Sequence, residues 1–216
     1  MRIALTGGIA CGKSMFAKFL TELGVRVVDA DDVVHELESP GGAAVAAIAE
    51  RFGDEVIAAD GGIDRERLAE KVFSSPAERA VLEDILFPLV RARLASDRGQ
   101  EGVLTVHVIP LLFESHWEKD YDIILCVVSP VEMQIDRMTR GRGYSRAHAE
   151  ARLAAQMPVA EKATKADYVV NNYSTPVELK AKAEGLVAWM KERTANERRR
   201  GNEEGRLDAG GRKRGV

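Results

Sequence analysis

The chain has 216 residues, 45% of them hydrophobic, which predicts one α/β domain with a core of its own. Its net charge of −3 conceals a basic end, because residues 195–216 hold seven Lys/Arg and four Asp/Glu whereas the remainder holds 24 and 30. An acidic body argues against an enzyme held on nucleic acid by phosphate contacts, and no apolar run approaches the ~20 residues that span a membrane. We therefore expect a soluble cytoplasmic protein with no nucleic-acid or membrane partner.

Apolar runs of strand length alternate with helical patterns, which predicts a parallel sheet covered by helices on both faces. The expected strands are 2–6, 25–29, 103–109, 123–128 and 168–171. The expected helices are 13–23, 43–52, 65–73, 77–97, 130–139, 145–156 and 176–192. From Ala195 onward apolar periodicity is absent and basic groups recur, so we expect a disordered, solvated extension.

A phosphate-binding pattern follows the first expected strand. Residues 7–14, GGIACGKS, fit G-x-x-x-x-G-K-[ST], in which glycines let backbone amides surround an anion at the start of a helix. In this pattern Lys13 reaches the β- and γ-phosphates of a nucleoside triphosphate, and the Ser14 hydroxyl binds Mg²⁺. The pattern indicates a bound nucleotide but not the reaction that follows.

Three carboxylates, Asp29, Asp31 and Asp32, stand at the end of the second expected strand. The carboxyl ends of strands face the ligand in an open α/β sheet, so we expect these acids to face the phosphates. A carboxylate there is suited to accept a proton from an alcohol or to hold Mg²⁺ through water. We favour Asp31 as general base, Asp29 as its support and Asp32 as a charge at a helix N-terminus. The alternative is that all three cap that helix.

A third candidate segment, residues 137–144, holds three arginines, and glycines flank Arg142. Phosphoryl transfer spreads negative charge over the transferring group, and an arginine on a mobile segment can close over that charge and expel water. We expect Arg142 to make this contact, with Arg140 as the alternative.

Six motifs occur in order along the chain. They are LTGGI at 5–9, VDAD at 28–31, GIDR at 62–65, PLLFE at 110–114, RLAAQ at 152–156 and DYVVNN at 167–172. This set resembles the dephospho-coenzyme A (dephospho-CoA) kinase family from Met1 to about Glu192. The resemblance implies an α/β, P-loop nucleoside/nucleotide-kinase-like three-layer fold with a parallel sheet, a helical substrate domain and a lid.

The resemblance also implies how the chain is divided. The kinase domain is expected at 1–194, with a nucleotide core at about 1–38 and 101–194, a helical acceptor-binding insertion at about 39–100 and a lid at about 138–150. The remaining segment, 195–216, is the expected tail. A monomer or a weak homo-oligomer is expected.

By the same resemblance, the chain transfers the γ-phosphoryl group of ATP, with Mg²⁺, to the ribose 3′-hydroxyl of dephospho-CoA, and so makes coenzyme A. The matching positions imply catalytic roles for Asp31, Lys13 and Arg142. The implied nucleotide-binding residues are Gly8, Ala10, Cys11, Gly12, Lys13, Ser14, Met15, Arg142 and Asn172, with Ser14 as the metal ligand. The implied acceptor-binding residues are Asp31, Arg65, Pro110, Leu111 and Glu114.

The chain departs from the family pattern at four positions. It has Ala10 and Tyr173 where glycine is usual, Met15 where threonine is usual, and Phe87 where histidine precedes proline. These departures leave open a catalytically degenerate nucleotide-binding paralogue. Another small-molecule or nucleoside monophosphate kinase would share the loop, base and lid, whereas a GTP-dependent switch protein is disfavoured because the Asn-Lys-x-Asp pattern is absent.

Overall fold

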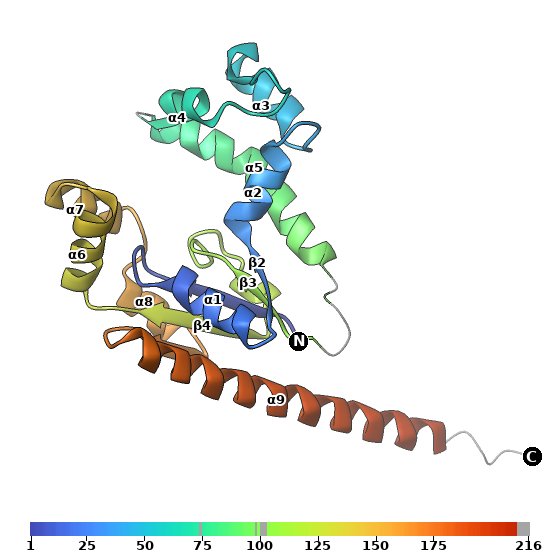
Figure 1. The fold of residues 1–216 in the computed structure, drawn as a ribbon. Helices are drawn as coiled ribbons and strands as arrows, with labels where there is room; N and C mark the ends of the chain where they lie inside the picture. Colours follow the sequence, from blue (N-terminus) through green and yellow to red (C-terminus); the bar gives the residue numbers. More distant parts are fainter. Residues whose placement is uncertain (74, 98, 100–102, 211–216) are drawn as a thin grey trace, which may run out of the picture.

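The computed structural model describes residues 1–73, 75–97, 99 and 103–210 of the chain. Its centre is a parallel sheet of five strands in the order β2-β3-β1-β4-β5 (Figure 1). The strands are β1 (Ile3–Gly7), β2 (Arg26–Asp29), β3 (Thr105–Val108), β4 (Ile123–Val128) and β5 (Tyr168–Asn171). All the predicted strands and the parallel sheet are confirmed, with bounds that differ by at most two residues.

Strand β1 lies in the middle of the sheet and is buried on both faces. Ile3 pairs with Val106 of β3 on one side and with Ile123 of β4 on the other. Because side chains alternate along a strand, Ile3 belongs to one core and Ala4 to the opposite one. This double burial accounts for the unbroken apolar run in β1.

Helices α1 (Lys13–Glu22) and α9 (Pro176–Gly210) cover one face of the sheet. Phe16 and Leu20 of α1 are fully buried there, together with Leu186 of α9. Since α1 begins directly after β1, this packing fixes the position of the loop that joins them.

The other face supports helices that rise away from the sheet as a helical projection (Figure 1). The projection consists of α2 (Ala30–Glu38), α3 (Val45–Phe52), the 3₁₀ helix η1 (Asp54–Val56), α4 (Arg65–Phe73) and α5 (Pro76–Ser96). Val33, Ile48 and Val90 join it in one apolar cluster that also includes Ala4 of β1. The cluster anchors the projection to the sheet.

A pair of helices, α6 (Val131–Arg142) and α7 (Arg146–Ala154), stands beside the sheet and carries its own small core (Figure 1). Met138 and Ala149 are fully buried in this core, and Ala10 of the loop after β1 packs against it. Two shorter elements, η2 (Glu118–Asp120) and α8 (Val159–Thr164), complete the fold. The helix pair therefore contacts the loop that was predicted to bind phosphate.

The structure differs from the sequence-based expectation in the helices. Helix α8 was not predicted, and α2 was expected only as a helix that starts at the acids 29–32, without an end point. Helix α6 extends to Arg142, so Arg142 lies in its last turn and not in a flexible linker. Gly143, with φ of 67°, ends the helix. Gly141 did not interrupt α6 because one glycine costs only about 1 kcal/mol in a helix.

Helix α9 continues to Gly210, whereas a disordered extension was expected from Ala195. An existing helix lengthens one residue at a time without a new nucleation cost, and residues 195–210 contain no proline to stop it. Residues 211–216 of the expected tail lie outside the described residues. Within the described part of the chain, no helix combines the length and apolarity that crossing a membrane requires.

Candidate active site

Segments far apart in the sequence meet around one cavity of about 400 Å³. The loop after β1, the start of α2, the end of β3, α6 and the segment after α7 all contribute to its wall. The lining residues are Ile9, Ala10, Gly12, Lys13, Ser14, Asp29, Asp31, Val108, Pro110, Arg137, Arg142 and Gln156. The cavity thus lies at the carboxyl edge of the sheet, where an open α/β fold binds its ligands.

The loop between β1 and α1 requires glycine at both ends. A Cβ on Gly7, at φ of 147°, would lie 2.2 Å from the carbonyl oxygen of Val127. A Cβ on Gly12, at φ of 90°, would lie 2.1 Å from Nδ2 of Asn172. Between them, Ala10 adopts a left-handed φ of 56°, which costs an L-residue about 1–2 kcal/mol. The loop therefore has the tight backbone that the phosphate-binding pattern predicts.

The Lys13 ammonium is held inside this loop. Its Nζ donates to the carbonyl oxygens of Gly7 at 2.9 Å and Gly8 at 2.8 Å. Burial lowers the pKa of Lys13, and the nearby Asp31 carboxylate opposes that shift. Ser14, the next residue, is exposed at the first turn of α1 and lines the same cavity.

Polar groups behind the loop fix its shape. The Ser129 hydroxyl donates to the Asn172 carbonyl oxygen at 2.5 Å. The Arg137 guanidinium donates to the carbonyl oxygens of Ala10 and Asn172, both at 3.1 Å. Arg137 also lines the cavity, so α6 contributes a fixed cation next to the loop. Sequence reasoning missed this role, although Arg137 begins the arginine-rich segment that was singled out.

The three acids after β2 have different surroundings. Asp29 is the N-cap of α2, and its Oδ1 accepts a hydrogen bond from the Asp31 amide at 3.0 Å. Burial raises the pKa of Asp29, with the neighbouring Asp31 carboxylate adding to the shift. Asp31 is exposed and lines the cavity, whereas Asp32 is exposed and lies outside the lining. Capping thus engages Asp29 alone and leaves the Asp31 carboxylate facing the cavity.

The two arginines considered for the phosphate contact, Arg142 and Arg140, have different positions and partners. Arg142 lines the cavity from the last turn of α6. Arg140 is 82% exposed, and its Nε lies 2.6 Å from Oδ1 of Asp136 one helical turn earlier. Of these two arginines, Arg142 alone therefore lines the cavity.

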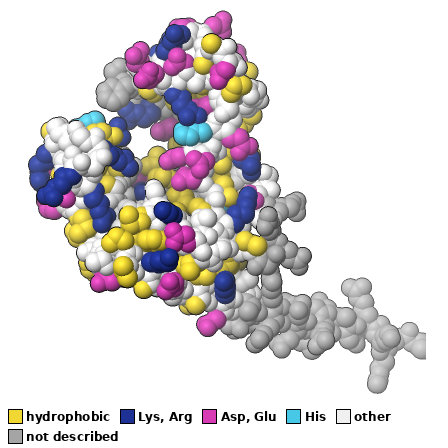
Figure 2. All heavy atoms as spheres, viewed as in Figure 1, with side chains coloured by type: hydrophobic (Ala, Val, Ile, Leu, Met, Phe, Trp, Pro, Cys, Tyr) yellow, Lys and Arg dark blue, Asp and Glu magenta, His cyan; other side chains and the backbone are white. Residues whose placement is uncertain are grey.

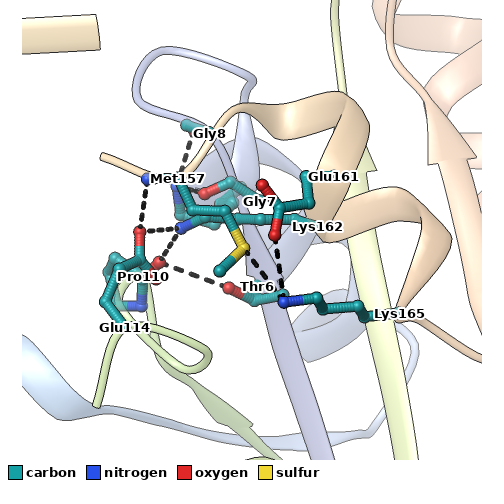
Figure 3. A network of polar contacts seen from close by, with 10 residues as sticks. Thr6, Gly7, Gly8, Pro110, Glu114, Met157, Glu161, Lys162 and Lys165 are labelled. Atoms are coloured by element: carbon teal, nitrogen blue, oxygen red, sulfur yellow. Dashed lines mark hydrogen bonds and ion pairs between the residues drawn. The ribbon is translucent and has the colours of Figure 1, made fainter. Parts of the chain in front are cut away.

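Basic side chains border the hollow between the α6–α7 pair and the helical projection (Figure 2). Arg65, at the start of α4, donates from Nε to the buried Glu38 carboxylate at 2.8 Å and lies outside the cavity lining. Pro110 lines the cavity, and Glu114 follows it in a network of polar contacts (Figure 3). The acceptor residues expected from the sequence therefore divide between the cavity and the projection.

Several expected binding residues lie outside the lining: Gly8, Cys11, Met15, Arg65, Leu111, Glu114 and Asn172. Cys11 and Asn172 are buried beneath the loop, and burial raises the pKa of the Cys11 thiol. Gln156 was not predicted to line the site, although it belongs to the RLAAQ motif, yet it lines the cavity. Its buried Oε1 has no hydrogen-bond partner among the described residues. Its place at the end of the RLAAQ motif was the signal that could have revealed it.

Three of the four residues that depart from the family pattern lie outside the cavity lining. Phe87 packs edge to face against Trp117, with ring centroids 5.5 Å apart. Met15 is 46% exposed on the first turn of α1. Tyr173 is 56% exposed, and the Lys182 ammonium lies 5.6 Å from its ring centroid. None of these side chains enters the cavity lining.

Comparisons with known proteins agree with this geometry. A family model described as dephospho-CoA kinase matches residues 1–178. The dephospho-CoA kinase of Anaeromyxobacter dehalogenans is 45% identical over 196 residues, which cover 88% of this chain and 92% of the relative.

Two solved structures are also similar. TT1252 from Thermus thermophilus has a TM-score of 0.73 at 32% identity, covering 87% of this chain and 96% of that one. Dephospho-CoA kinase from Campylobacter jejuni has a TM-score of 0.70 at 25% identity, covering 89% and 98%. The chain belongs to the dephospho-CoA kinase family.

Proposed function

We propose that this protein transfers the γ-phosphoryl group of ATP to the ribose 3′-hydroxyl of dephospho-CoA and so produces coenzyme A. The observation that carries this proposal is the single cavity shared by Lys13, Asp31 and Arg142. A phosphate-binding loop, a carboxylate and an arginine on one wall are the groups that phosphoryl transfer to an alcohol requires. Membership of the dephospho-CoA kinase family indicates that dephospho-CoA is the alcohol that accepts the phosphoryl group.

Each of these side chains has a distinct task in the proposed reaction. The loop amides and the Lys13 ammonium bind the β- and γ-phosphates. The acceptor oxygen attacks the γ-phosphorus, the bond from that phosphorus to the β–γ bridging oxygen breaks, and ADP leaves. The hydroxyl proton passes to the Asp31 carboxylate. Arg142 stabilises the charge that spreads over the transferring group.

Mg²⁺ fits the same cavity. Hydroxyl and carboxylate oxygens are the ligands that this ion prefers, and Ser14, Asp29 and Asp31 present them around the loop. In the proposal Ser14, Asp29 and Asp31 would hold the ion. Bound there, Mg²⁺ would neutralise part of the negative charge on the β- and γ-phosphates.

The expected division of the chain is proposed as part of this function. The nucleotide core, about 1–38 and 101–194, includes the sheet, α1 and α2, and the acceptor-binding insertion, about 39–100, includes α3, α4 and α5. The lid, about 138–150, spans the end of α6 and the start of α7 and brings Arg142 to the phosphates. Because the reaction consumes ATP and a small acceptor, we place it in the cytoplasm.

The test is acceptor choice with the purified protein and Mg·ATP, reading ADP release. Dephospho-CoA should be phosphorylated at the ribose 3′-hydroxyl with a kcat/KM at least about tenfold above that for shikimate, gluconate, AMP or dTMP, a difference of about 1.4 kcal/mol. Equal turnover of a control acceptor would instead support another small-molecule kinase. ATP binding without turnover of any acceptor would support a degenerate paralogue.

A further inference from the structure

A buried cation lies next to the candidate active site without being part of its cavity lining. Lys162, on α8, has a fully buried side chain. Its Nζ lies 2.7 Å from Oε1 of Glu114 and donates to the carbonyl oxygen of Pro110 at 2.8 Å (Figure 3). A buried ammonium group is costly unless it is paired and hydrogen-bonded, and here both conditions are met.

The groups bound by Lys162 belong to the acceptor side of the cavity. Pro110 lines that cavity, and its carbonyl oxygen also accepts from the Thr6 hydroxyl of β1 at 3.3 Å. Oε1 of Glu114 also accepts from the Met157 amide at 3.0 Å. Met157 directly follows Gln156, which lines the cavity two residues after the end of α7. The Lys162 ammonium therefore connects three parts of the protein: the central strand β1, the Pro110–Glu114 segment (the acceptor wall) and the segment that follows α7.

Two further observations connect this network with ligand binding. Oε2 of Glu114 and Oε1 of Gln156 are both buried, and neither has a hydrogen-bond partner among the described residues. Unpaired buried acceptors are uncommon, and Gln156 lines the cavity, where a bound substrate with hydroxyl or amino groups would satisfy its Oε1. The Lys162 charge also lies close enough to Lys13 to add to the lowering of the Lys13 pKa that burial mainly causes.

Stability alone is a weak reason for such a pair. Replacing a buried ion pair with apolar side chains is often neutral or stabilising. The pair is therefore better explained by its effect on the relative position of the two segments that it joins. The pair also joins segments 48 residues apart, as Glu114 and Lys162 are numbered. A fixed geometry between these segments determines where the acceptor wall stands relative to the phosphate loop.

We propose that Lys162 is a positioning residue for the acceptor: it holds Pro110 and Glu114 in place, and so sets acceptor affinity without touching ATP. This inference rests on the proposed function, since it assigns the wall to the phosphoryl acceptor. Lys162 acts through its two partners and is not itself a catalytic residue.

The first test compares Lys162→Met with a matched control, Lys165→Met. Lys165 is three residues further along, 45% exposed, and pairs with Glu161 at 3.1 Å (Figure 3). Its Nζ also lies 3.9 Å from Sδ of Met157 and 5.7 Å from the ring centroid of Phe113, so the control contacts the same segments, whereas the bonds to Glu114 and to the Pro110 carbonyl oxygen belong to Lys162. Lys162→Met should raise the KM for dephospho-CoA about tenfold or more, as the loss of one buried hydrogen-bonded contact predicts. The KM for ATP should change by less than about threefold, and Lys165→Met should match the wild type.

A second variant separates positioning from folding. Lys162→Met leaves the Glu114 charge unpaired, whereas Lys162→Met/Glu114→Gln removes both charges and should recover the melting temperature. If the pair acts as a unit, the acceptor KM of the double variant should stay within about twofold of that of Lys162→Met, because the two effects do not add.

The outcomes are distinct. A wild type that phosphorylates dephospho-CoA, together with a Lys162→Met variant of unchanged acceptor KM, overturns the positioning role and leaves the proposed function standing. An equal rise in the KM values for ATP and acceptor, or a loss of folded protein in both variants, assigns Lys162 a structural role and overturns it too. A wild type that does not use dephospho-CoA contradicts the proposed function and this inference with it.

Discussion

Asn172 donates a hydrogen bond from Nδ2 to the carbonyl oxygen of Cys11 at 2.8 Å, across 161 positions of sequence. Both side chains are buried, and Nδ2 occupies the space that a Cβ on Gly12 would need. The end of β5 therefore defines the shape of the phosphate loop from behind. In this arrangement Asn172 contacts the backbone of the loop and does not line the cavity.

The first prediction follows from this contact. Asn172→Asp replaces the donor with a carboxylate that faces a buried carbonyl oxygen, and leaving such an acceptor unsatisfied costs about 1–3 kcal/mol. The dissociation constant for ATP, measured by calorimetry, should rise roughly tenfold. The neighbouring Asn171→Asp is the control, since Asn171 is exposed. Equal affinities in the two variants would contradict a role for Asn172 in shaping the loop.

A second prediction concerns the base. The Asp31 carboxylate faces the cavity, whereas Asp29 is engaged as the N-cap of α2. Asp31→Asn should lower kcat by about 10²–10⁴-fold with little change in ATP affinity, because the amide cannot take the hydroxyl proton. Asp32→Asn should remain close to wild type in the same steady-state assay. Near-normal turnover of Asp31→Asn would move the role to one of the other two acids.

The third prediction concerns the arginines of α6. Arg142→Ala should lower kcat about 100-fold or more, because the guanidinium meets charge that develops during transfer. Arg142→Lys should recover only part of the rate, since an ammonium lacks the planar fork that binds two phosphate oxygens. Arg140→Ala should change kcat little, because Arg140 pairs with Asp136 and is 82% exposed. The reverse order of the two alanine variants would reassign the contact to Arg140.

The sheet could be predicted because its strands are short apolar runs that are buried on both sides. Residues 123–128 and 168–171 match β4 and β5 to the residue. Helix α8 was missed because its six residues are too few for an apolar period to appear. A helix at the acids after β2 was expected, but that Asp29 is the one that caps α2 is visible only in the structure.

The part of the cavity lining that short motifs mark could be predicted from the sequence. Lys13 and Ser14 follow from the loop pattern, and Asp31 from the end of the second strand, and all three line the cavity. The places of Lys162 and Gln156 could not be recognised in this way. They depend on which loops pack against these residues, and that information is in the tertiary structure and not in local spacing.

A fourth prediction concerns pH. His107 is buried between Tyr121 and Asp97, with Nδ1 at 3.0 Å from the tyrosine hydroxyl and Nε2 at 3.3 Å from the carboxylate. Burial lowers the pKa of His107, although the Asp97 carboxylate opposes the shift. The unfolded chain, with a His pKa near 6.5, therefore takes up the proton more readily than the folded protein. The contribution of His107 to the free energy of unfolding should therefore be complete above about pH 6.5. It should be lost as the pH falls from there through the lower pKa of the folded protein.

The measurement is the urea midpoint between about pH 7.5 and 5.5. His107→Gln is the matched variant, because its amide can donate to Asp97 and accept from the Tyr121 hydroxyl without titrating. Its midpoint should decline less than that of the wild type over this range. Parallel curves would show that the other histidines or acids, and not His107, control the acid sensitivity.

The last prediction is that the end of α9 is dispensable for folding and catalysis. The buried apolar residues that attach this helix to the sheet are Leu179, Ala183, Leu186, Val187 and Met190. All precede Thr194, and the family model ends at residue 178. A chain that stops after Thr194 should keep kcat/KM unchanged within error. Its melting temperature should fall by less than about 2–4 °C, the shift that 1 kcal/mol causes in a protein of this size.

The control is a chain that stops after Gly185. It loses the buried side chains of Leu186, Val187 and Met190, each worth about 1.5–3 kcal/mol, and should not remain folded. A large loss of stability in the chain that stops after Thr194 would instead show that residues beyond Thr194 pack on the rest of the protein.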